Sequence, residues 1–319
     1  MGLARQPGAC PLSQGRPLSQ GNPQSQGHAL LSGGSSGIGL ALAHRLGAAG
    51  WDLTLLARDQ DRLAAAKATL LAHGGRVETR SADVAEPEAV EAAVASAIAA
   101  LGPPRLLVAC AGIVVPGLFL DQPLAAFHRT MAVNYLGALH LVRAALPAMR
   151  MAGQGHIVLV ASGAALIGLC GYGSYAPSKF AVRGLGEALR SELKPDGIGV
   201  SVAYPPDTDT PGLREELRLR PAVTSELAAA GGLMSADQVA AAILGGVAKG
   251  RFAITPGAQM TALAWLHSLI GPWLHRFQFD PVVARHLPAR PAASADERPG
   301  RARVRPDRPI GSNEVERIK

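Results

Sequence analysis

Short apolar runs alternate with longer amphipathic stretches along most of the chain. The apolar runs at 28–32, 52–57, 105–110, 156–162 and 200–204 have the length of buried strands, and a further strand is expected through Val77. Between them, helical patterns cover 40–50, 59–73, 86–100, 124–149 and 175–193. Strands that alternate with helices in this way predict an α/β fold, with one doubly wound parallel sheet and helices on both of its faces.

The two ends of the chain depart from this pattern and set the expected boundaries. Residues 1–27 are rich in Gln, Gly, Pro and Ser, and residues 288–319 are rich in Arg, Pro and Ala, so we expect both segments to be disordered. The sheet domain is expected to occupy residues 28–256. Residues 257–287 are then an apolar C-terminal extension.

The positive charge lies mainly in these ends. The formal net charge is +7, but Arg5 and Arg16 give residues 1–28 a charge of +2, and residues 284–319 carry nine Lys or Arg against five Asp or Glu. The centre is therefore close to neutral, and we do not expect it to bind nucleic acid. Binding through the ends is an alternative, which predicts an affinity that falls steeply with salt.

Three scattered cysteines, Cys10, Cys110 and Cys170, fit neither a disulfide framework nor a zinc site. The N-terminal segment has no apolar run of the kind that a signal peptide needs. We therefore expect reduced thiols, no bound metal and a cytoplasmic protein.

The first expected strand leads into a glycine-rich segment, GGSSGIG, and then into a helix. Glycines at this place let the backbone turn sharply and approach a phosphate, while free N–H groups at the helix start attract the anion. The spacing Gly33-x-x-x-Gly37-x-Gly39 differs from the commoner G-x-G-x-x-G, and a simple Gly/Ser turn is the alternative. Because strand, loop and helix follow in the right order, we predict a pyrophosphate site at Gly33, Ser35, Ser36, Gly37, Ile38 and Gly39.

Arg58 follows the second expected strand, where NAD-selective sites commonly carry an acid for the ribose 2′-hydroxyl. A guanidinium at this place suits a 2′-phosphate, so we predict NADP rather than NAD. The alternative is that Arg58 merely lies at the entrance of the next helix.

The candidate chemistry lies between Ser162 and Lys179. Tyr175 and Lys179 are four residues apart, which on a helix places both side chains on one face. A neighbouring ammonium lowers the pKa of a phenol and can make it a general acid, and the hydroxyl of Ser162 could orient a substrate carbonyl. Asn134 lies within a long amphipathic helix, where a solvated or capping residue is the alternative to a site residue.

The chain resembles the short-chain dehydrogenase/reductase superfamily over about residues 28–255. The resemblance rests on GGSSGIG, Asn134, Ser162, Tyr175 and Lys179 in this order, with Ser162 thirteen positions before Tyr175. It implies that Tyr175 protonates a ketone oxygen as NADPH delivers hydride. It also implies that Ser162 orients the developing alkoxide. Lys179 would lower the pKa of Tyr175 and form a hydrogen bond with the nicotinamide ribose. Asn134 would anchor a water relay that resupplies the proton.

The resemblance implies further cofactor contacts, beside adenine, ribose, carboxamide and phosphates, at Arg58, Asp83, Val84, Ala111, Tyr175, Lys179, Pro205, Thr208 and Thr210. Two positions depart from the superfamily pattern. Ala109-Cys110-Ala111-Gly112 replaces the usual Asn-Asn-Ala-Gly, so asparagine contacts that brace the fourth strand are missing. Pro205-Pro206 replaces the usual Pro-Gly and removes one backbone N–H near the nicotinamide.

Within the superfamily, AYPPDTDTPG, NYLGALH and YGSYAPSKFAVRGLGEALRSELKP resemble the 3-ketodihydrosphingosine reductases. This implies NADPH-dependent reduction of a long-chain lipid ketone, 3-ketosphinganine, in sphingolipid biosynthesis. One alternative is reduction of a 3-oxoacyl thioester by the same catalytic residues. Another is a cofactor-binding protein without turnover.

The segment 252–275 has no Asp, Glu, Lys or Arg, yet polar residues and prolines interrupt it too often for a membrane-spanning helix. We expect a lid over an alkyl chain, a helix at a membrane surface or a subunit contact. Residues 213–232 are expected to form a mobile substrate loop. Peripheral contact with the cytoplasmic membrane face is a further expectation. A homo-oligomer, formed through the helices that bear the asparagine and the tyrosine, is implied by the resemblance.

Overall fold

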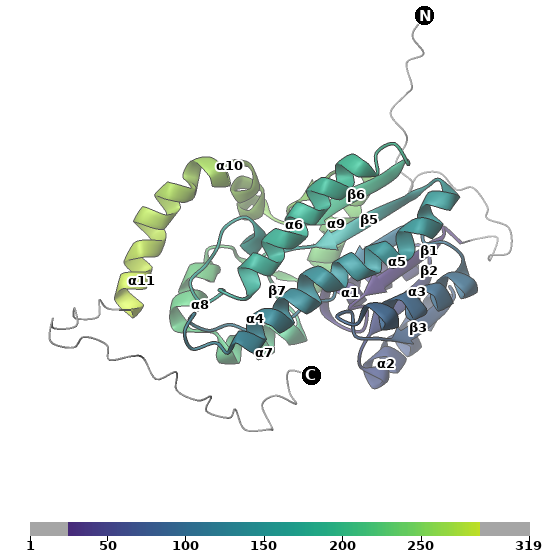
Figure 1. Ribbon diagram of the computed structural model, residues 1–319, viewed down its shortest axis with the longest axis horizontal. Coiled ribbons are helices and arrows are strands. Elements are labelled where there is room, and N and C mark those ends of the chain that lie inside the picture. The colour runs from purple at the N-terminus through teal and green to yellow at the C-terminus, as the bar shows by residue number, and fades with distance from the viewer. Residues whose placement is uncertain (1–24, 288–319) are drawn as a thin grey trace, which may run out of the picture. The chain divides into compact units, whose positions relative to one another are not determined.

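A seven-stranded parallel sheet forms the centre of the protein (Figure 1). The computed structural model describes residues 25–287. The strands, in the spatial order β3-β2-β1-β4-β5-β6-β9, are Val77–Ser81, Asp52–Ala57, His28–Ser32, Leu106–Ala109, Gly155–Val160, Ile198–Ala203 and Ala253–Ile254. The chain order reverses between β1 and β4, and at such a switch point the carboxyl ends of parallel strands open a crevice for a ligand.

Helices cover both faces of this sheet, as predicted. One face packs against α1 (Gly37–Ala48), α2 (Gln60–Leu70) and α9 (Ala236–Ala248), with a short 3-10 turn, η1 (Leu71–His73), after α2. The other packs against α3 (Pro87–Leu101), α5 (Gly137–Ala152) and α6 (Tyr175–Glu192). Figure 1 shows α3, α5 and α6 side by side on one face of the strands. The predicted α/β class is confirmed.

The strands between the edge strands β3 and β9 are largely apolar on both faces, because each face has its own core. In β1, Leu30 packs into the cluster on the α3, α5 and α6 side, whereas Ala29 and Leu31 pack into the cluster on the α1, α2 and α9 side. Successive side chains of a strand point to opposite faces, so a fully buried strand requires an unbroken apolar run. This requirement made the strands recognisable in the sequence.

The long helical region that begins at Leu124 has an unusual centre. It consists of α4 (Leu124–Met131), the π-helical segment η2 (Ala132–Leu136) and α5. The π-helical turn contains Asn134, which is buried. Single π turns within α-helices are frequent at functional sites, and the apolar periodicity gave no sign of this one.

The expected loop at 213–232 is mainly helical, so that prediction was wrong. After the short strand β7 (Asp207–Asp209) the chain forms α7 (Pro211–Leu219) and α8 (Ala222–Ala229), and β8 (Leu233–Ser235) then pairs with β7. Thr210 caps α7 by accepting a hydrogen bond from the Leu213 N–H, with Pro211 at the first helical position. A Thr-Pro pair of this kind is a helix-start signal.

The C-terminal extension is also helical. It comprises α10 (Ala258–Leu274), the π-helical segment η4 (His275–Phe279) and α11 (Asp280–His286), and α11 packs on α8. Within residues 25–287, no helix is long and apolar enough to cross a membrane. The predicted disorder at 1–27 and 288–319 falls almost entirely outside the described residues.

Candidate active site

The predicted site residues follow the carboxyl ends of five strands. The glycine-rich loop follows β1, Arg58 follows β2, Asp83 and Val84 follow β3, Ala111 follows β4, and Ser162 follows β5. These strands are neighbours in one parallel sheet, so their carboxyl ends share an edge. The topology thus gathers residues that are more than 100 positions apart in the sequence.

The loop between β1 and α1 has the conformation of a phosphate cradle. Gly33 and Gly37 have φ angles of 68° and 53°, a region that favours glycine. A methyl group at Gly39 would lie 2.3 Å from the carbonyl oxygen of Gly33, so only glycine allows α1 to start this close to the strand. Ser36 is the N-cap residue of α1, and Ile38 packs against the core beneath the loop. The first turn of α1 has no acidic side chain, which leaves its positive end for an anion.

The groups after β2 and β3 are linked electrostatically. Burial opposes ionisation of Asp83 and by itself raises the pKa of that carboxyl. Hydrogen bonds from Arg129 and the Ala85 N–H lower the pKa, as do the charges of Arg129 and Arg58. The net result is a pKa below the ordinary value of an aspartate. Val84 is buried beside the start of α5. Arg58 is exposed at the end of β2, where the 2′-phosphate of NADP was predicted. Arg129 was missed, because nothing in the sequence pairs it with Asp83.

A serine braces the strand end that lacks the usual asparagines. The hydroxyl oxygen of Ser32 accepts hydrogen bonds from the N–H groups of Cys110 and Ala111, at 3.1 and 3.2 Å. These bonds tie the end of β4 to the end of β1. The missing asparagine contacts are therefore replaced, at least in part, by a residue that the sequence analysis did not single out.

Ser162 and Tyr175 are close enough to act on one substrate atom. Ser162 lies two residues beyond β5, and its hydroxyl oxygen accepts a hydrogen bond from the Ala164 N–H at 3.1 Å. Burial raises the pKa of Tyr175 above its ordinary value, the hydrogen bond with Ser162 lowers it, and the charges of Glu216 and Asp207 raise it further. The expected lowering of this pKa by Lys179 is therefore not observed. The phenol is held protonated and bonded to Ser162.

Lys179 is buried on the same face of α6 as Tyr175, as its spacing predicted. Its Nζ atom lies 5.7 Å from the centre of the Tyr175 ring and donates a hydrogen bond to the carbonyl oxygen of Val160 at 3.1 Å. Burial lowers the pKa of this ammonium to about 8. A methyl group at Gly112 would lie 3.3 Å from Nζ and 3.2 Å from Oδ1 of Asn134. Lys179 and Asn134 thus face the same point.

Asn134 is held rigidly rather than solvated. Its Oδ1 accepts from the Ile113 N–H at 2.8 Å, and its Nδ2 donates to the Ile113 carbonyl at 3.0 Å and to the Ser178 hydroxyl at 2.9 Å. Ser178 in turn donates to the carbonyl oxygen of Tyr175 at 2.6 Å. Asn134 therefore joins the segment after β4, the π-helical turn and α6. Ser178 was missed, although it lies between Tyr175 and Lys179.

The segment after β6 closes over the glycine-rich loop. The Pro205 carbonyl accepts a hydrogen bond from the Gly163 N–H at 2.9 Å, which joins this segment to the turn after Ser162. Thr208 is buried in β7 and donates to the Pro206 carbonyl. A methyl group at Gly37 would lie 3.0 Å from Cγ2 of Thr210. Thr210 therefore lies next to the predicted phosphate loop.

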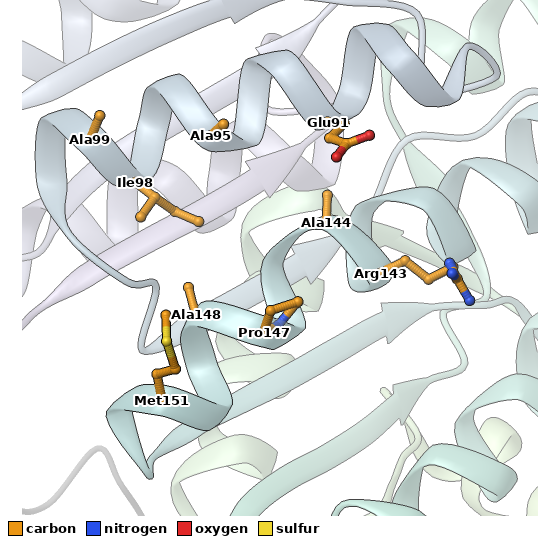
Figure 2. A pocket seen from close by; sticks show the side chains of 9 residues that line it. All are labelled: Glu91, Ala95, Ile98, Ala99, Arg143, Ala144, Pro147, Ala148 and Met151. Atoms are coloured by element: carbon orange, nitrogen blue, oxygen red, sulfur yellow. The ribbon is translucent and has the colours of Figure 1, made fainter.

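A separate hollow of about 460 Å³ lies between α3 and α5. Figure 2 shows small alanine side chains and one methionine, Met151, around it. Met151 is exposed. Its lining consists of Glu91, Ala95, Ile98, Ala99, Arg143, Ala144, Pro147, Ala148 and Met151. None of the predicted site residues lies in it. Among residues 25–287, no three His, Cys, Asp or Glu side chains are close enough together to hold a metal ion.

Three comparisons with known proteins agree with this geometry. The family model for short chain dehydrogenases matches residues 27–219. The 3-dehydrosphinganine reductase of Danio rerio is 39% identical over 250 residues, which cover 77% of this chain and 75% of that protein. The 3-ketodihydrosphingosine reductase of Dictyostelium discoideum is 36% identical over 275 residues, which cover 81% of this chain and 82% of that protein.

Comparison with solved structures also identifies dehydrogenases and reductases as similar proteins. Levodione reductase is similar with a TM-score of 0.68 and 26% identity, covering 75% of this chain and 99% of that one. An alcohol dehydrogenase from Thermococcus sibiricus, complexed with 5-hydroxy-NADP, is similar with a TM-score of 0.60 and 27% identity, covering 68% of this chain and 88% of that one. With its glycine-rich loop and its Asn134, Ser162, Tyr175 and Lys179 in place, the chain belongs to the short chain dehydrogenase family of oxidoreductases.

Proposed function

We propose that the protein is an NADPH-dependent reductase of 3-ketosphinganine, forming sphinganine in sphingolipid biosynthesis. The observation that carries the chemistry is the meeting of Ser162, Tyr175 and Lys179 at the carboxyl edge of the sheet, beside the glycine-rich loop. The printed names of the relatives, 3-dehydrosphinganine reductase and 3-ketodihydrosphingosine reductase, support the substrate.

The residues present fit NADPH. The backbone at Gly33, Gly37 and Gly39 leaves a cradle that any side chain at Gly39 would close, and the first turn of α1 favours an anion. Arg58 would hold the 2′-phosphate. The cofactor, when bound, supplies a hydride for the carbonyl carbon. Lys179 and Thr210 would hold its nicotinamide end and its phosphates.

The protein side of the reaction is a proton transfer to the ketone oxygen. Tyr175, protonated through the neutral range, donates its phenolic proton to the oxygen as negative charge develops there. Ser162 donates a hydrogen bond to the same oxygen and orients it. The Lys179 ammonium, bonded to the Val160 carbonyl, places a positive charge next to the phenolate that results. Asn134 fixes α6 through Ser178. We propose, on the resemblance, that Asn134 also anchors the water that resupplies the proton.

The substrate assay separates this proposal from its alternatives. We expect purified enzyme to consume NADPH with detergent-dispersed 3-ketosphinganine and to be far less active with acetoacetyl-CoA or with NADH. Tyr175→Phe should lower the rate by about 10²-fold or more, because it removes the general acid. Turnover of acetoacetyl-CoA alone would indicate a 3-oxoacyl thioester reductase. NADPH binding without turnover of either ketone would indicate a cofactor-binding protein.

We also propose that α10 brings the enzyme to an anionic membrane surface, where its lipid substrate resides. Trp265, Leu269, Trp273 and Phe277 recur every fourth residue, and their exposed fractions are 83, 80, 59 and 59%. They therefore form one apolar stripe along α10 and η4. Arg276 is exposed next to this stripe and has the charge for anionic lipid.

The N-terminal turn of α10 lies beside the turn that follows Ser162. Met260, in the first turn of α10, is buried, and its sulfur lies 2.8 Å from where a side chain at Gly163 would begin. Gly163 follows Ser162 directly. A lipid that enters along α10 would therefore arrive at the residues that act on its ketone, which supports the combined role of surface contact and lid.

Two further features of the protein are proposed on the resemblance. We propose a homo-oligomer that uses α6 and the helix formed by α4, η2 and α5, and light scattering of the purified protein tests it. We propose that the protein is cytoplasmic and lies peripherally at the cytoplasmic membrane face, which fractionation of cells with high-salt washes tests.

A further inference from the structure

A largely buried group of charges lies next to the catalytic tyrosine. It consists of Asp207 in β7, Glu216 in α7, Arg220 at the C-terminal end of α7, and Tyr172 in the segment before α6. Glu216 and Arg220 are each 8% exposed and Tyr172 is 4% exposed. We refer to these four residues as the Arg220 network. None of the roles assigned above uses it.

The network is fully connected by hydrogen bonds. Arg220 donates to both carboxylate oxygens of Asp207, at 2.7 and 3.1 Å, and its Nε donates to Oε1 of Glu216 at 2.8 Å. The same Glu216 oxygen accepts from the Tyr172 hydroxyl at 2.5 Å. The guanidinium carbon also lies 5.6 Å from the centre of the Tyr172 ring. One side chain thus joins β7, α7 and the turn that leads into α6.

The last member of the network contacts the catalytic residue. The rings of Tyr172 and Tyr175 pack edge to face, with their centres 5.2 Å apart. Tyr172 and Tyr175 also share a small apolar cluster with Ala164 and Ala176. The orientation of the Tyr175 ring is therefore fixed on one side by a ring whose hydroxyl is held by Glu216.

A buried ion pair contributes little to the stability of a protein. Taking charges out of water is costly, and well-packed apolar side chains often stabilise a protein as much or more. The hydrogen bonds from the planar guanidinium of Arg220 instead fix the relative positions of the groups that it joins. These groups are β7 in the segment over the glycine-rich loop, the helix α7 beyond it, and the turn that leads into α6 and its catalytic tyrosine.

The network also sets the charge around Tyr175. The charges of Glu216 and Asp207 raise the pKa of Tyr175, and the charge of Arg220 lowers it. The other groups that face the phenol are Ser162, which lowers its pKa by a hydrogen bond, and Lys179 on its own helix.

We propose that Arg220 is a positioning residue of the reductase, which acts through Glu216 and Tyr172 to hold Tyr175 for proton transfer. The inference rests on the proposed reductase function and not on the identity of the ketone. It assigns to α7, expected from sequence to be part of a mobile loop, a fixed place behind the active site.

The test compares Arg220→Met with Arg218→Met. Arg218 lies on the same helix in an exposed pair with Glu215 and serves as the matched control. For 3-ketosphinganine reduction we expect Arg220→Met to lower kcat by about 10-fold or more, since small misplacements of reacting groups cost up to 10²-fold. The Kd for NADPH should change less than about 2-fold, because a reduction of kcat at constant cofactor affinity locates the effect at the reacting centre. Arg218→Met should match the wild type.

Two milder variants keep the test valid if Arg220→Met does not fold. Tyr172→Phe keeps the ring and removes the hydroxyl that Glu216 holds, and we expect it to lower kcat in the same direction. Glu216→Gln keeps the hydrogen bonds and removes the charge. Oxidation of the product alcohol requires the Tyr175 phenolate, so the rate of this oxidation should rise with pH. Glu216 raises the pKa of Tyr175 and Arg220 lowers it. The rise in rate should therefore move to lower pH in Glu216→Gln and to higher pH in Arg220→Met. A purely structural role would not shift the two profiles in opposite directions.

The outcomes separate the inference from the function on which it rests. Unchanged kcat and unchanged pH profiles in the folded variants would overturn the inference while the wild-type activity stands. Reduction of acetoacetyl-CoA instead of 3-ketosphinganine would overturn the proposed substrate. The same variants would then be assayed with acetoacetyl-CoA. A wild type that reduces neither ketone would overturn both.

Discussion

At the scale of single residues, the site contains a cation whose burial opposes its charge. Lys179 is 5% exposed and bonded to one carbonyl oxygen, and burial lowers its pKa from an ordinary value of 10.5 to about 8. The chain therefore holds a charged lysine at neutral pH against a desolvation cost. A functional position explains why such a residue is retained.

Replacing Lys179 with Met should make the protein more stable and nearly inactive. Below pH 8 the lysine is charged in the folded and the unfolded chain, and the cost of burial is present in full. Between pH 8 and 10.5 the unfolded chain binds more protons, so the free energy of unfolding of the wild type rises with pH. At pH 7 we expect Lys179→Met to be more stable on the order of 2 kcal/mol, and this advantage should shrink as the pH rises towards 10.

Urea unfolding of both proteins between pH 6 and about 9.5, a range chosen to include the shifted lysine pKa, measures this difference. Lys249→Met is the control, because Lys249 is exposed at the end of α9. A wild type that is the more stable protein at pH 7, or a difference that does not change with pH, would contradict the account.

Individual site residues were predictable where their type and spacing carry the chemistry. Tyr175 and Lys179 share a helix face and Ser162 follows a strand, so their convergence could be expected from local sequence. Their pKa values could not be expected, because burial depends on packing from distant segments. Ser32, Ser178 and the Arg220 network were missed for the same reason, since each partner is set by the tertiary fold.

At the scale of elements, β1 and the start of α1 approach so closely that only glycine fits between them. The prediction of a phosphate cradle depends on glycine at positions where a side chain would meet backbone atoms. We expect Gly39→Ala to weaken NADPH binding by about 10-fold or more, because its methyl group would meet the Gly33 carbonyl and overpacking costs about 1–3 kcal/mol. Titration of NADPH fluorescence measures the affinity.

Gly245→Ala is the matched control for this prediction. Gly245 lies within α9, and a methyl group there would meet nothing within 4 Å. We expect this variant to bind NADPH as the wild type does and to be slightly more stable, since alanine favours a helix over glycine by about 1 kcal/mol. Equal affinities of Gly39→Ala and the wild type would show that the loop does not hold the cofactor.

The strands β1 to β6 and the helices α1 to α6 were visible in the apolar pattern, whereas two irregular features were not. The π-helical turn at Asn134 keeps the apolar periodicity around it, and α7 and α8 are short helices whose large apolar residues are few. In α7 the buried face includes Glu216 and ends at Arg220. Apolar periodicity therefore does not identify the buried side of this helix, because Leu217 and Leu219 are exposed.

At the scale of the whole molecule, the proposed membrane contact depends on the stripe along α10. We expect the triple variant Trp265→Gln, Leu269→Gln and Trp273→Gln to lose at least about 10-fold in affinity for vesicles of phosphatidylcholine and phosphatidylserine, because each large apolar side chain contributes roughly 1.5–3 kcal/mol when buried. Sedimentation with vesicles measures the bound fraction. Leu71→Gln is the control, because Leu71 is a half-exposed leucine between α2 and β3.

Two results would change this part of the account. Vesicle binding equal to that of the wild type would exclude α10 as the membrane contact. If the triple variant instead changed from an oligomer to a monomer in light scattering, the stripe would be a subunit contact. The apolar composition of 252–275 was evident from the sequence, but its exposure on one side of a helix required the structure.

The central claim is that this chain transfers hydride from NADPH to a sphingoid ketone while Tyr175 supplies the proton. The most direct test uses NADPH that carries deuterium at both hydrogen positions of the nicotinamide C4, with 3-ketosphinganine as the substrate and mass spectrometry of the product. The account predicts sphinganine with one deuterium at C3 from the wild type and little product from Tyr175→Phe. Unlabelled sphinganine, or equal product from both proteins, would contradict it.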